Sequence, residues 1–283
     1  MGQSDTVTHD QISLPPALEA KGTLSVALAD IAAGWGRRQL WWTLAYQDLI
    51  AQYRRSIIGP FWITLQMTAF TLGIAILYSA LFKQDFVAFL PYVALGFLIW
   101  GLISGMVVNS TSSYVSQAGY IRSTSLPLSI YAFRLVSSQM WLFLHNVVPV
   151  VLLLVFLRVT PSPWAIVYVP LGLLLIVLNG FFLSLWLGPL SARYRDLMPL
   201  ISSAMQLIMF VTPVFWDAAT LPNRAVVVLN PFAYFLDSVR YPLLDRYVDP
   251  MTWVVLGAIT LVNAIVGLYL FGRNRRWIAH WVA

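Results

Sequence analysis

The fold is decided at residues 53–62, which read Tyr-Arg-Arg-Ser-Ile-Ile-Gly-Pro-Phe-Trp. The two arginines cannot enter hydrocarbon cheaply, so they mark the water side of a membrane boundary. Gly59 and Pro60 interrupt a helix, because proline suits the first turn of a helix better than its interior. Residues 61–81 then carry no charge, over a length that can cross a hydrocarbon core of ~30 Å. The chain is expected to lie along the membrane surface before this boundary and to cross the bilayer after it.

The composition is that of an integral membrane protein. Of the 283 residues, 59% are hydrophobic and 10% are charged, whereas a soluble domain carries about 25% charged residues. The chain has no cysteine, which excludes disulfides, a thiol nucleophile and cysteine metal sites, and we expect no metal site. The net charge of +6 fits a protein whose basic residues set its orientation and meet anionic lipids. Membrane lipids, and no nucleic acid, are therefore the expected partners.

Apolar stretches predict an all-α membrane protein with six transmembrane helices, and residues 59–272 are expected to form this domain. Residues 25–58 are expected to form an amphipathic interface helix, because aromatic and polar side chains alternate there at roughly helical spacing. A simple surface anchor is the alternative role for that helix. Residues 1–24, which lack a signal-peptide core, and 273–283 are expected to be cytoplasmic tails. The six predicted spans are 60–81, 92–115, 131–157, 164–190, 198–216 and 251–272.

Basic residues are divided unevenly between the two sides of these spans. Cytoplasmic loops carry the excess of Lys and Arg, so the richer side is expected to be cytoplasmic, together with both termini. The poorer side has Lys83, Arg158, Arg224, Arg240 and Arg246. The richer side has Arg37, Arg38, Arg54, Arg55, Arg122, Arg134, Arg193, Arg195, Arg273, Arg275 and Arg276.

Two connections between the spans are unusual. The cytoplasmic connection at residues 117–127 is short and exposed. The outer connection at residues 217–250 is long, and its apolar segments 225–229 and 232–244 are each too short to cross a bilayer. We expect these segments to be two short re-entrant outer half-helices that cap or gate a pathway, since irregular backbone at that depth needs protein or water around it. A peripheral outer loop is the alternative.

Catalytic motifs are missing from the sequence. There is no GxxxxGK[ST] phosphate-binding loop, so the chain is not expected to hydrolyse ATP by that route. The predicted spans contain no Asp or Glu, which disfavours a proton- or sodium-coupled carrier. His145 raises the question of an intramembrane serine protease, but residues 101–105 have one residue too many for the GxSG turn of that class. The polar residues within the spans are expected mainly to form helix–helix hydrogen bonds.

Aromatic side chains are the richest chemical resource of the predicted spans. Their flat apolar faces, with a polar group on Tyr and Trp, can stack on sugar rings without gripping any one hydroxyl. Anchoring at the membrane interface is the alternative role. We expect a substrate conduit lined by rings of the first and fifth spans, namely Phe70, Tyr78, Phe82, Phe210, Phe215 and Trp216.

An ordered series of motifs resembles the ABC-2 type membrane subunits that export bacterial surface polysaccharides, above all the O-antigen and teichoic-acid exporters. Each motif alone is weak, but together they span nearly all of residues 35–275. They follow the basic amphipathic lead-in and are Tyr53-Arg54-Arg55-Ser56 with Gly59-Pro60-Phe61-Trp62, then Ile121-Arg122 and Leu126-Pro127, then Ala192-Arg193-Tyr194-Arg195-Asp196-Leu197, and finally Leu229-Asn230-Pro231-Phe232 with Tyr241-Pro242.

This resemblance implies a transport subunit in the bacterial inner membrane rather than an enzyme. It implies a homodimer of this chain, bound to two copies of a separate ABC ATPase that carries ATP and Mg, with no cofactor in this chain. The implied substrate is an O-antigen-like polysaccharide linked to undecaprenyl diphosphate. In that family the connection between spans two and three packs on the ATPase, which here points to Gly119, Tyr120, Ile121, Arg122 and Ser123.

The implied lipid carrier brings two phosphates to the cytoplasmic head-group level. Arginine makes bidentate, charge-assisted bonds to phosphate, so we expect Arg37, Arg38, Arg54 and Arg55 to guide the diphosphate. Orientation and binding of anionic lipid are the alternative role for these arginines. For the whole chain, the alternatives are an ABC-2 exporter of another lipid or small molecule and, from a different class, a membrane scaffold or intramembrane enzyme. An adjacent ATPase reading frame separates the exporters from that other class.

Overall fold

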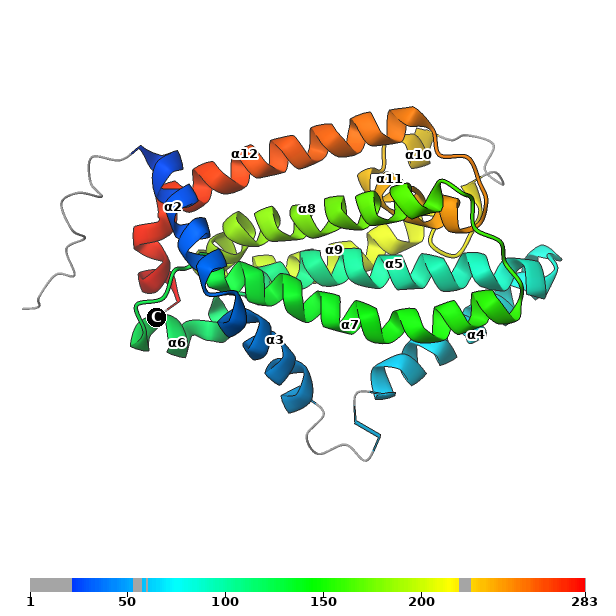
Figure 1. Cartoon of the computed structure of the whole chain (residues 1–283), viewed down its shortest axis with the longest axis horizontal. Helices are drawn as coiled ribbons and strands as arrows, with labels where there is room; N and C mark the ends of the chain where they lie inside the picture. Colours follow the sequence, from blue (N-terminus) through cyan, green and yellow to red (C-terminus); the bar gives the residue numbers. More distant parts are fainter. Residues whose placement is uncertain (1–21, 53–57, 60, 219–224, 283) are drawn as a thin grey trace, which may run out of the picture.

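The computed structural model describes residues 22–52, 58–59, 61–218 and 225–282. These residues form a bundle of α-helices, and none of them lies in a β-strand (Figure 1). The predicted all-α class is therefore confirmed for this part of the chain. The helices in chain order are α2 (Thr23–Gly36), α3 (Arg38–Gln52), α4 (Phe61–Phe82), α5 (Phe86–Ser112), α6 (Ala118–Ser123), α7 (Ser129–Phe156), α8 (Ala165–Arg193), α9 (Leu197–Val211), α10 (Ala225–Val228), α11 (Pro231–Leu243) and α12 (Pro250–Trp281), with a 3₁₀ turn, η1, at Val115–Gln117.

Among the described residues, five helices are long and apolar enough to cross a membrane: α4, α5, α7, α8 and α12. The central one is α5, since 78% of its most apolar 18-residue window is buried, against 11% for α4. α5 begins at Phe86, earlier than the predicted residue 92, because Asp85 caps it by accepting a hydrogen bond from Ala88 N (2.8 Å). Helices α4, α7, α8, α9 and α11 all contact α5.

The fifth predicted span, residues 198–216, is only partly helical. α9 ends at Val211 because Pro213 follows, and Thr212 takes the extended backbone (φ −86°, ψ 138°) that a residue before proline favours. The 15 residues of α9 rise about 22 Å, which is shorter than a hydrocarbon core of ~30 Å. The chain continues as an irregular segment, residues 212–216, most of which is buried.

The single amphipathic helix predicted over residues 25–58 is two helices, α2 and α3, which are interrupted at Arg37. Gly34 lies where α2 approaches α7, and a side chain there would collide with Ser129 Oγ. The interruption is stabilised by Trp41, whose Nε1 donates to Gly34 O (3.2 Å). At the other end of the sequence, the predicted tail at 273–283 continues the helix, because α12 runs on to Trp281.

Figure 1 shows two distinct ends of the bundle. The short helix α6, the start of α2 and the end of α12 lie together at the left end. The half-helices α10 and α11 lie at the right end, together with the turn between α4 and α5. Both described ends of the chain and the predicted ATPase-contacting connection therefore share one end of the bundle.

Candidate functional site

Aromatic rings from three helices and residues 212–216 meet on one side of α5. Phe70 of α4 contacts Phe97 of α5 edge to face, with ring centroids 5.0 Å apart. Phe97 stacks on Phe215 at 5.9 Å. Phe215 in turn contacts Tyr78 of α4 at 5.1 Å and Phe210 of α9 at 5.9 Å. We call these five rings the aromatic cluster.

Four of the six aromatic residues predicted to line a conduit thus belong to one connected cluster. Trp216 lies beside it, because its Nε1 donates to Phe210 O (3.1 Å). The side chain of Phe82 lies outside the described atoms. The exposed fractions of the Phe70 and Phe210 side chains are 52% and 61%, whereas Phe97 and Phe215 are buried. The cluster therefore offers two open rings, one from α4 and one from α9, on a fixed aromatic base.

The irregular segment at residues 212–216 is held by a buried arginine of α11. Arg240 is fully buried, and its Nη1 donates to Pro213 O (2.7 Å). Its Nη2 lies 2.6 Å from Asp237 Oδ1, and its guanidinium lies 3.9 Å from the centre of the Tyr92 ring.

Side chains of Tyr92 and Asn230 complete the network around residues 212–216. Tyr92 donates its hydroxyl to Trp216 O (3.0 Å), and Asn230 Nδ2 donates to Thr212 Oγ1 (2.8 Å). The side-chain oxygen Oδ1 of Asn230 also accepts from Phe232 N (3.0 Å) and so caps α11. Irregular backbone within a membrane protein must find its hydrogen bonds in this way.

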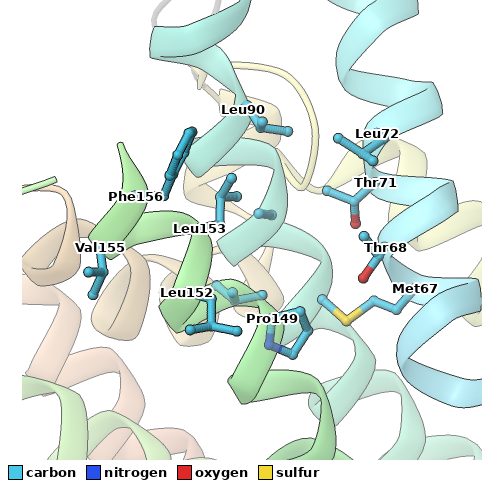
Figure 2. A pocket seen from close by; sticks show the side chains of 12 residues that line it. Met67, Thr68, Thr71, Leu72, Leu90, Pro149, Leu152, Leu153, Val155 and Phe156 are labelled. Carbon is cyan, nitrogen blue, oxygen red and sulfur yellow. The ribbon is translucent and has the colours of Figure 1, made fainter. Parts of the chain in front are cut away.

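A pocket of about 610 Å³ lies between α4, α5 and α7. Figure 2 shows Thr68, Thr71 and Leu72 of α4 across the pocket from Leu152 and Leu153 of α7. Thr71 is 5% exposed, and its Oγ1 has no hydrogen-bond partner among the described residues. A second pocket of about 400 Å³ adjoins the first at Met67 and has a more polar lining that includes Gln66, Gln139 and Asn146.

The predicted ATPase-contacting connection contains the six-residue helix α6. Gly119, Tyr120, Arg122 and Ser123 are exposed, as a docking surface requires. Ile121 was predicted to belong to the same exposed connection, but it is buried. It packs in a buried apolar cluster at this end of the bundle, because the helical turn of α6 directs its side chain inward.

A bidentate ion pair fixes η1, immediately before α6, against α3 and α7. Arg134 of α7 donates from Nε and Nη2 to the two carboxylate oxygens of Asp48, at 2.7 and 2.6 Å. Its Nη1 donates to Gln117 Oε1 (2.8 Å), and its guanidinium lies 5.7 Å from the centre of the Tyr120 ring. The Arg134 side chain is 9% exposed and that of Asp48 is 41% exposed, so the ion pair is buried on the arginine side and open to solvent on the carboxylate side.

A second ionic contact joins α2, α7 and α12 at the same end of the bundle. The buried carboxylate of Asp30 accepts from Ser129 N (2.8 Å), Leu128 N (3.2 Å) and Arg275 Nε (2.6 Å). Leu128, the N-cap residue of α7, has no side-chain acceptor, so α2 supplies the cap that α7 lacks. These contacts tie the start of α7 to α2 and α12.

The four arginines predicted to guide a diphosphate fall into two separate pairs. Arg37 and Arg38 are exposed at the junction of α2 and α3. Arg54 and Arg55 lie outside the described residues. α3, which begins at Arg38, ends at Gln52, before Arg54 and Arg55 in the sequence.

Other polar residues of the spans make structural contacts. His145 Nδ1 donates to Trp141 O (2.8 Å) and Ser104 Oγ to Gly101 O (3.5 Å), so each is bonded within its own helix. Asn179 and Asn263 join α8 to α12 by a hydrogen bond from Asn263 Nδ2 to Asn179 Oδ1 (3.0 Å). Over the described residues, no group of three or more His, Cys, Asp or Glu side chains is placed to hold a metal ion.

Three parts of this site were not predicted from the sequence, although two of them have a signal in it. Asp30 shares a helical face with Ala27 and Gly34, and an acid on an otherwise buried face indicates a specific partner. Arg240 follows Asp237 by one helical turn in a half-helix of mainly apolar residues. Phe97 has no comparable signal, because one more Phe in an apolar span looks like core.

Comparison with known proteins places these elements in a family. Residues 39–244, which run from α3 to just beyond α11, match the family described as ABC-2 type transporter. The chain is 22% identical over 232 residues to the O-antigen export system permease protein RfbA of Klebsiella pneumoniae, covering 80% of this chain and 88% of that protein. It is 23% identical over 242 residues to the protein of the same name from Myxococcus xanthus, covering 84% of this chain and 93% of that protein. Because the family match spans well over half of its length, the chain belongs to the ABC-2 type transporter family.

Proposed function

We propose that this chain is the permease subunit of an ATP-driven exporter of an O-antigen-like polysaccharide, carried on undecaprenyl diphosphate across the bacterial inner membrane. The observation that carries the proposal is the likeness to O-antigen permeases along 88% and 93% of their own lengths. The sequence has no phosphate-binding loop, so ATP and Mg bind on a separate ATPase. Two copies of that ATPase act on a homodimer of this chain, which is itself a transport subunit and not an enzyme.

In the proposed membrane arrangement, α9 and residues 212–216 together form a sixth span. The half-helices α10 and α11 re-enter the outer leaflet, and the Arg240 network supports this placement by satisfying irregular backbone. Both termini are cytoplasmic, which agrees with the excess of arginine at the end that carries α6. Single cysteines test this arrangement in a chain that has none, with Ser123→Cys shielded and Tyr247→Cys labelled from outside.

The aromatic cluster is the proposed wall of the polymer path at the dimer interface. Two exposed rings from different helices, Phe70 and Phe210, present apolar faces on which sugar rings can stack. A surface without ionic groups holds a neutral or charged glycan loosely, and loose holding lets a polymer slide. Trp216 and Phe82 extend this proposed wall.

The exposed face of α6 is the proposed docking surface for the ATPase. Gly119, Tyr120, Arg122 and Ser123 form that surface, and buried Ile121 anchors it to the bundle. Arg134 contacts Gln117 and the Tyr120 ring of α6 and pairs with Asp48 of α3. Asp30 of α2 joins the start of α7 to Arg275 of α12. These contacts are a route by which ATP-driven closure can shift the spans.

The diphosphate of the lipid carrier is proposed to meet Arg54 and Arg55, next to the start of α4. A bidentate phosphate site needs the planar guanidinium, whereas orientation needs only positive charge. The double Arg54→Lys, Arg55→Lys variant is therefore expected to lose export at normal membrane levels. Full export by this variant removes the case for a diphosphate site.

Deletion of the coding sequence tests the proposed substrate directly. Lipid-linked glycan, measured in isolated inner membranes, is expected to accumulate while surface polymer disappears, and the wild-type chain should reverse both changes. Normal surface polymer after deletion would contradict the proposal.

The apolar pocket in Figure 2 favours one alternative, an ABC-2 exporter of another lipid or small molecule. Its volume of about 610 Å³ and its apolar lining suit a drug-sized hydrophobic ligand. This alternative predicts that the deletion leaves surface polymer unchanged and raises sensitivity to hydrophobic toxins.

A further inference from the structure

A third hollow, of about 680 Å³, lies beneath the elbow where α2 meets α3, against α7, α8 and α12. It shares no lining residue with the pocket of Figure 2 or with the aromatic cluster. Its lining is almost wholly apolar, and aromatic rings predominate near the elbow. They include Trp35, Trp41, Trp42, Phe133, Phe181 and Phe182.

The rim of this elbow hollow exposes large apolar side chains. Leu28, Trp35 and Trp42 have exposed fractions of 50%, 56% and 44%. The inner wall is fixed, because Trp41 stacks on Phe133 with ring centroids 5.3 Å apart and an interplanar angle of 16°. A fixed apolar hollow with an open apolar rim indicates contact with something other than water.

The elbow itself carries unbalanced positive charge. Arg37 and Arg38 are exposed, and neither has an ion-pair partner among the described residues. The described acidic residues of α2 and α3 are already engaged, Asp30 by Arg275 and Asp48 by Arg134. The free charge of the elbow is therefore available to an anion from outside the chain.

The charge and the hollow are close enough to act on one molecule. Arg38 and Trp42 lie one turn apart on the same face of α3, and Trp42 lines the hollow. Trp35 of α2, two residues before Arg37, lines it as well. A ligand with an anionic head and an apolar chain matches this pattern of two cations beside an aromatic hollow.

We propose that the elbow hollow binds one anionic phospholipid of the cytoplasmic leaflet, with its phosphate at Arg37 and Arg38 and an acyl chain against the tryptophans. This inference rests on the proposed cytoplasmic placement of α2 and α3 and not on the identity of the transported substrate. The bound lipid stabilises the packing of α2 and α3 against α7. These two helices supply Asp30 and Asp48 to the ion pairs near α6. The proposed site uses Arg37 and Arg38, whereas the proposed diphosphate site uses Arg54 and Arg55.

Lipid retention by the purified full-length chain tests this site. The chain is reconstituted in nanodiscs of phosphatidylcholine with a minor fraction of phosphatidylglycerol, released into mild detergent, and weighed by native mass spectrometry. The wild type is expected to keep one phosphatidylglycerol. Arg37→Gln with Arg38→Gln should bind it about 30-fold more weakly, because the two arginines contribute about equally to the affinity for an anionic head group. The charge-matched control, Arg273→Gln with Arg276→Gln, removes two exposed arginines from the same end and should retain the lipid.

A second pair of variants tests the hollow without touching the charge. Ala32 is exposed and lines the hollow, whereas its neighbour Ala33 is exposed and does not line it. Ala32→Trp should fill the hollow and expel the lipid, and Ala33→Trp should keep it. Unfolding midpoints matched to the wild type show that each variant is folded.

Three results would overturn the inference. Equal retention of phosphatidylcholine and phosphatidylglycerol would leave ordinary boundary lipid with no head-group selection. Displacement of phosphatidylglycerol by one equivalent of a polyprenyl phosphate would assign the hollow to the lipid carrier. A dimer that keeps no lipid, with the hollow covered by its second copy, would make the elbow a protein interface. Export is not measured in this assay, so the lipid-retention result stays valid even where the proposed polysaccharide function fails.

Discussion

The seam between α8 and α12 and the side of the bundle that carries α4 are packed differently. At the seam, polar side chains satisfy one another, since Asn179 Nδ2 donates to Thr260 Oγ1 (2.7 Å) and Trp186 Nε1 donates to Asn263 Oδ1 (2.9 Å). Along α4, pockets of about 610 and 400 Å³ lie between this helix and its neighbours α5 and α7. There Thr71 Oγ1 lacks a partner in the described part of the chain.

We call the α8–α12 seam the scaffold, and we expect transport to depend on the α4 side of the bundle. Hydrogen bonds and close backbone contact are what hold helices together in lipid, so the α8–α12 seam is expected to stay fixed. The α4 side carries the open rings of the aromatic cluster and has few contacts to break when it moves. We therefore expect substitutions in the scaffold to change stability, and substitutions on the α4 side to change transport.

The largest expected effect on stability is at the ion pair of α11, a helix that packs against both α8 and α12 of the scaffold. Arg240→Met leaves the carboxylate of Asp237, which is 16% exposed, without its partner, and losing one member of a buried pair costs about 3–5 kcal/mol. The unfolding midpoint in detergent should fall sharply. The double variant Arg240→Met, Asp237→Leu removes both charges and should recover much of the loss. A single variant as stable as the wild type would show that Arg240 does not hold residues 212–216.

A large loss of transport is expected at α6. Tyr120→Asp with Arg122→Glu reverses the character of the exposed face and should abolish most export while membrane levels stay normal. Ile121→Asp, by contrast, places a charge in the buried cluster and should lower stability as well. Surface polymer and co-purification with the ATPase measure the two outcomes. Normal export by the Tyr120 and Arg122 variant would place the coupling surface elsewhere.

Matched glycine substitutions sharpen the contrast between the two regions. A methyl group at Gly267 of α12 would come within 2.8 Å of Phe182 O in α8, so Gly267→Ala should lose about 1–3 kcal/mol. Gly73 of α4 has nothing within 4 Å of that position, so Gly73→Ala should gain about 0.5–1 kcal/mol from reduced backbone entropy. Thermal unfolding of both variants gives the comparison. The same sign for both would mean that the α4 side is packed as closely as the seam.

The smallest effects are expected from the open rings. Phe70→Ala and Phe210→Ala remove surface that is more than half exposed, so stability should change little while export falls several-fold. Trp253→Ala and Trp277→Ala serve as controls. The Trp253 ring is tilted against that of Tyr168, with centroids 5.2 Å apart, and Trp277 lies near the end of α12. Equal loss of export in both pairs would show that the rings of Phe70 and Phe210 act only as membrane anchors.

Much of the fold could be predicted from composition and periodicity alone. Uncharged runs of the right length locate α4, α5, α7, α8 and α12, because hydrocarbon forces the backbone to satisfy itself in helices. The errors lie where a local rule overrides hydropathy. Pro213 ends α9 before its apolar run ends, and α5 begins after its N-cap Asp85 and continues through Pro91, although the span was predicted to begin at residue 92.

The candidate site was predictable where one helix face carries the signal and not where two elements must meet. Phe70, Tyr78, Phe210 and Phe215 stand out because large rings recur in the spans, and the structure brings them together through Phe97. Long-range pairs such as Asp48 with Arg134 depend on how α3 crosses α7, which spacing within one helix does not determine.

The central claim is that the side formed by α4 and α9 faces the second copy of the chain and the polymer path. The chain contains no cysteine, so single cysteines on exposed positions report contacts between copies without background. A disulfide forms only when two Cα atoms lie within about 7 Å, so oxidation in native membranes detects direct neighbours. The account predicts cross-linked dimers from Phe70→Cys, Leu207→Cys or Phe210→Cys, and none from the equally exposed α12 positions Leu261→Cys and Val262→Cys. Dimers that form through α12, with none through α4 or α9, would contradict it.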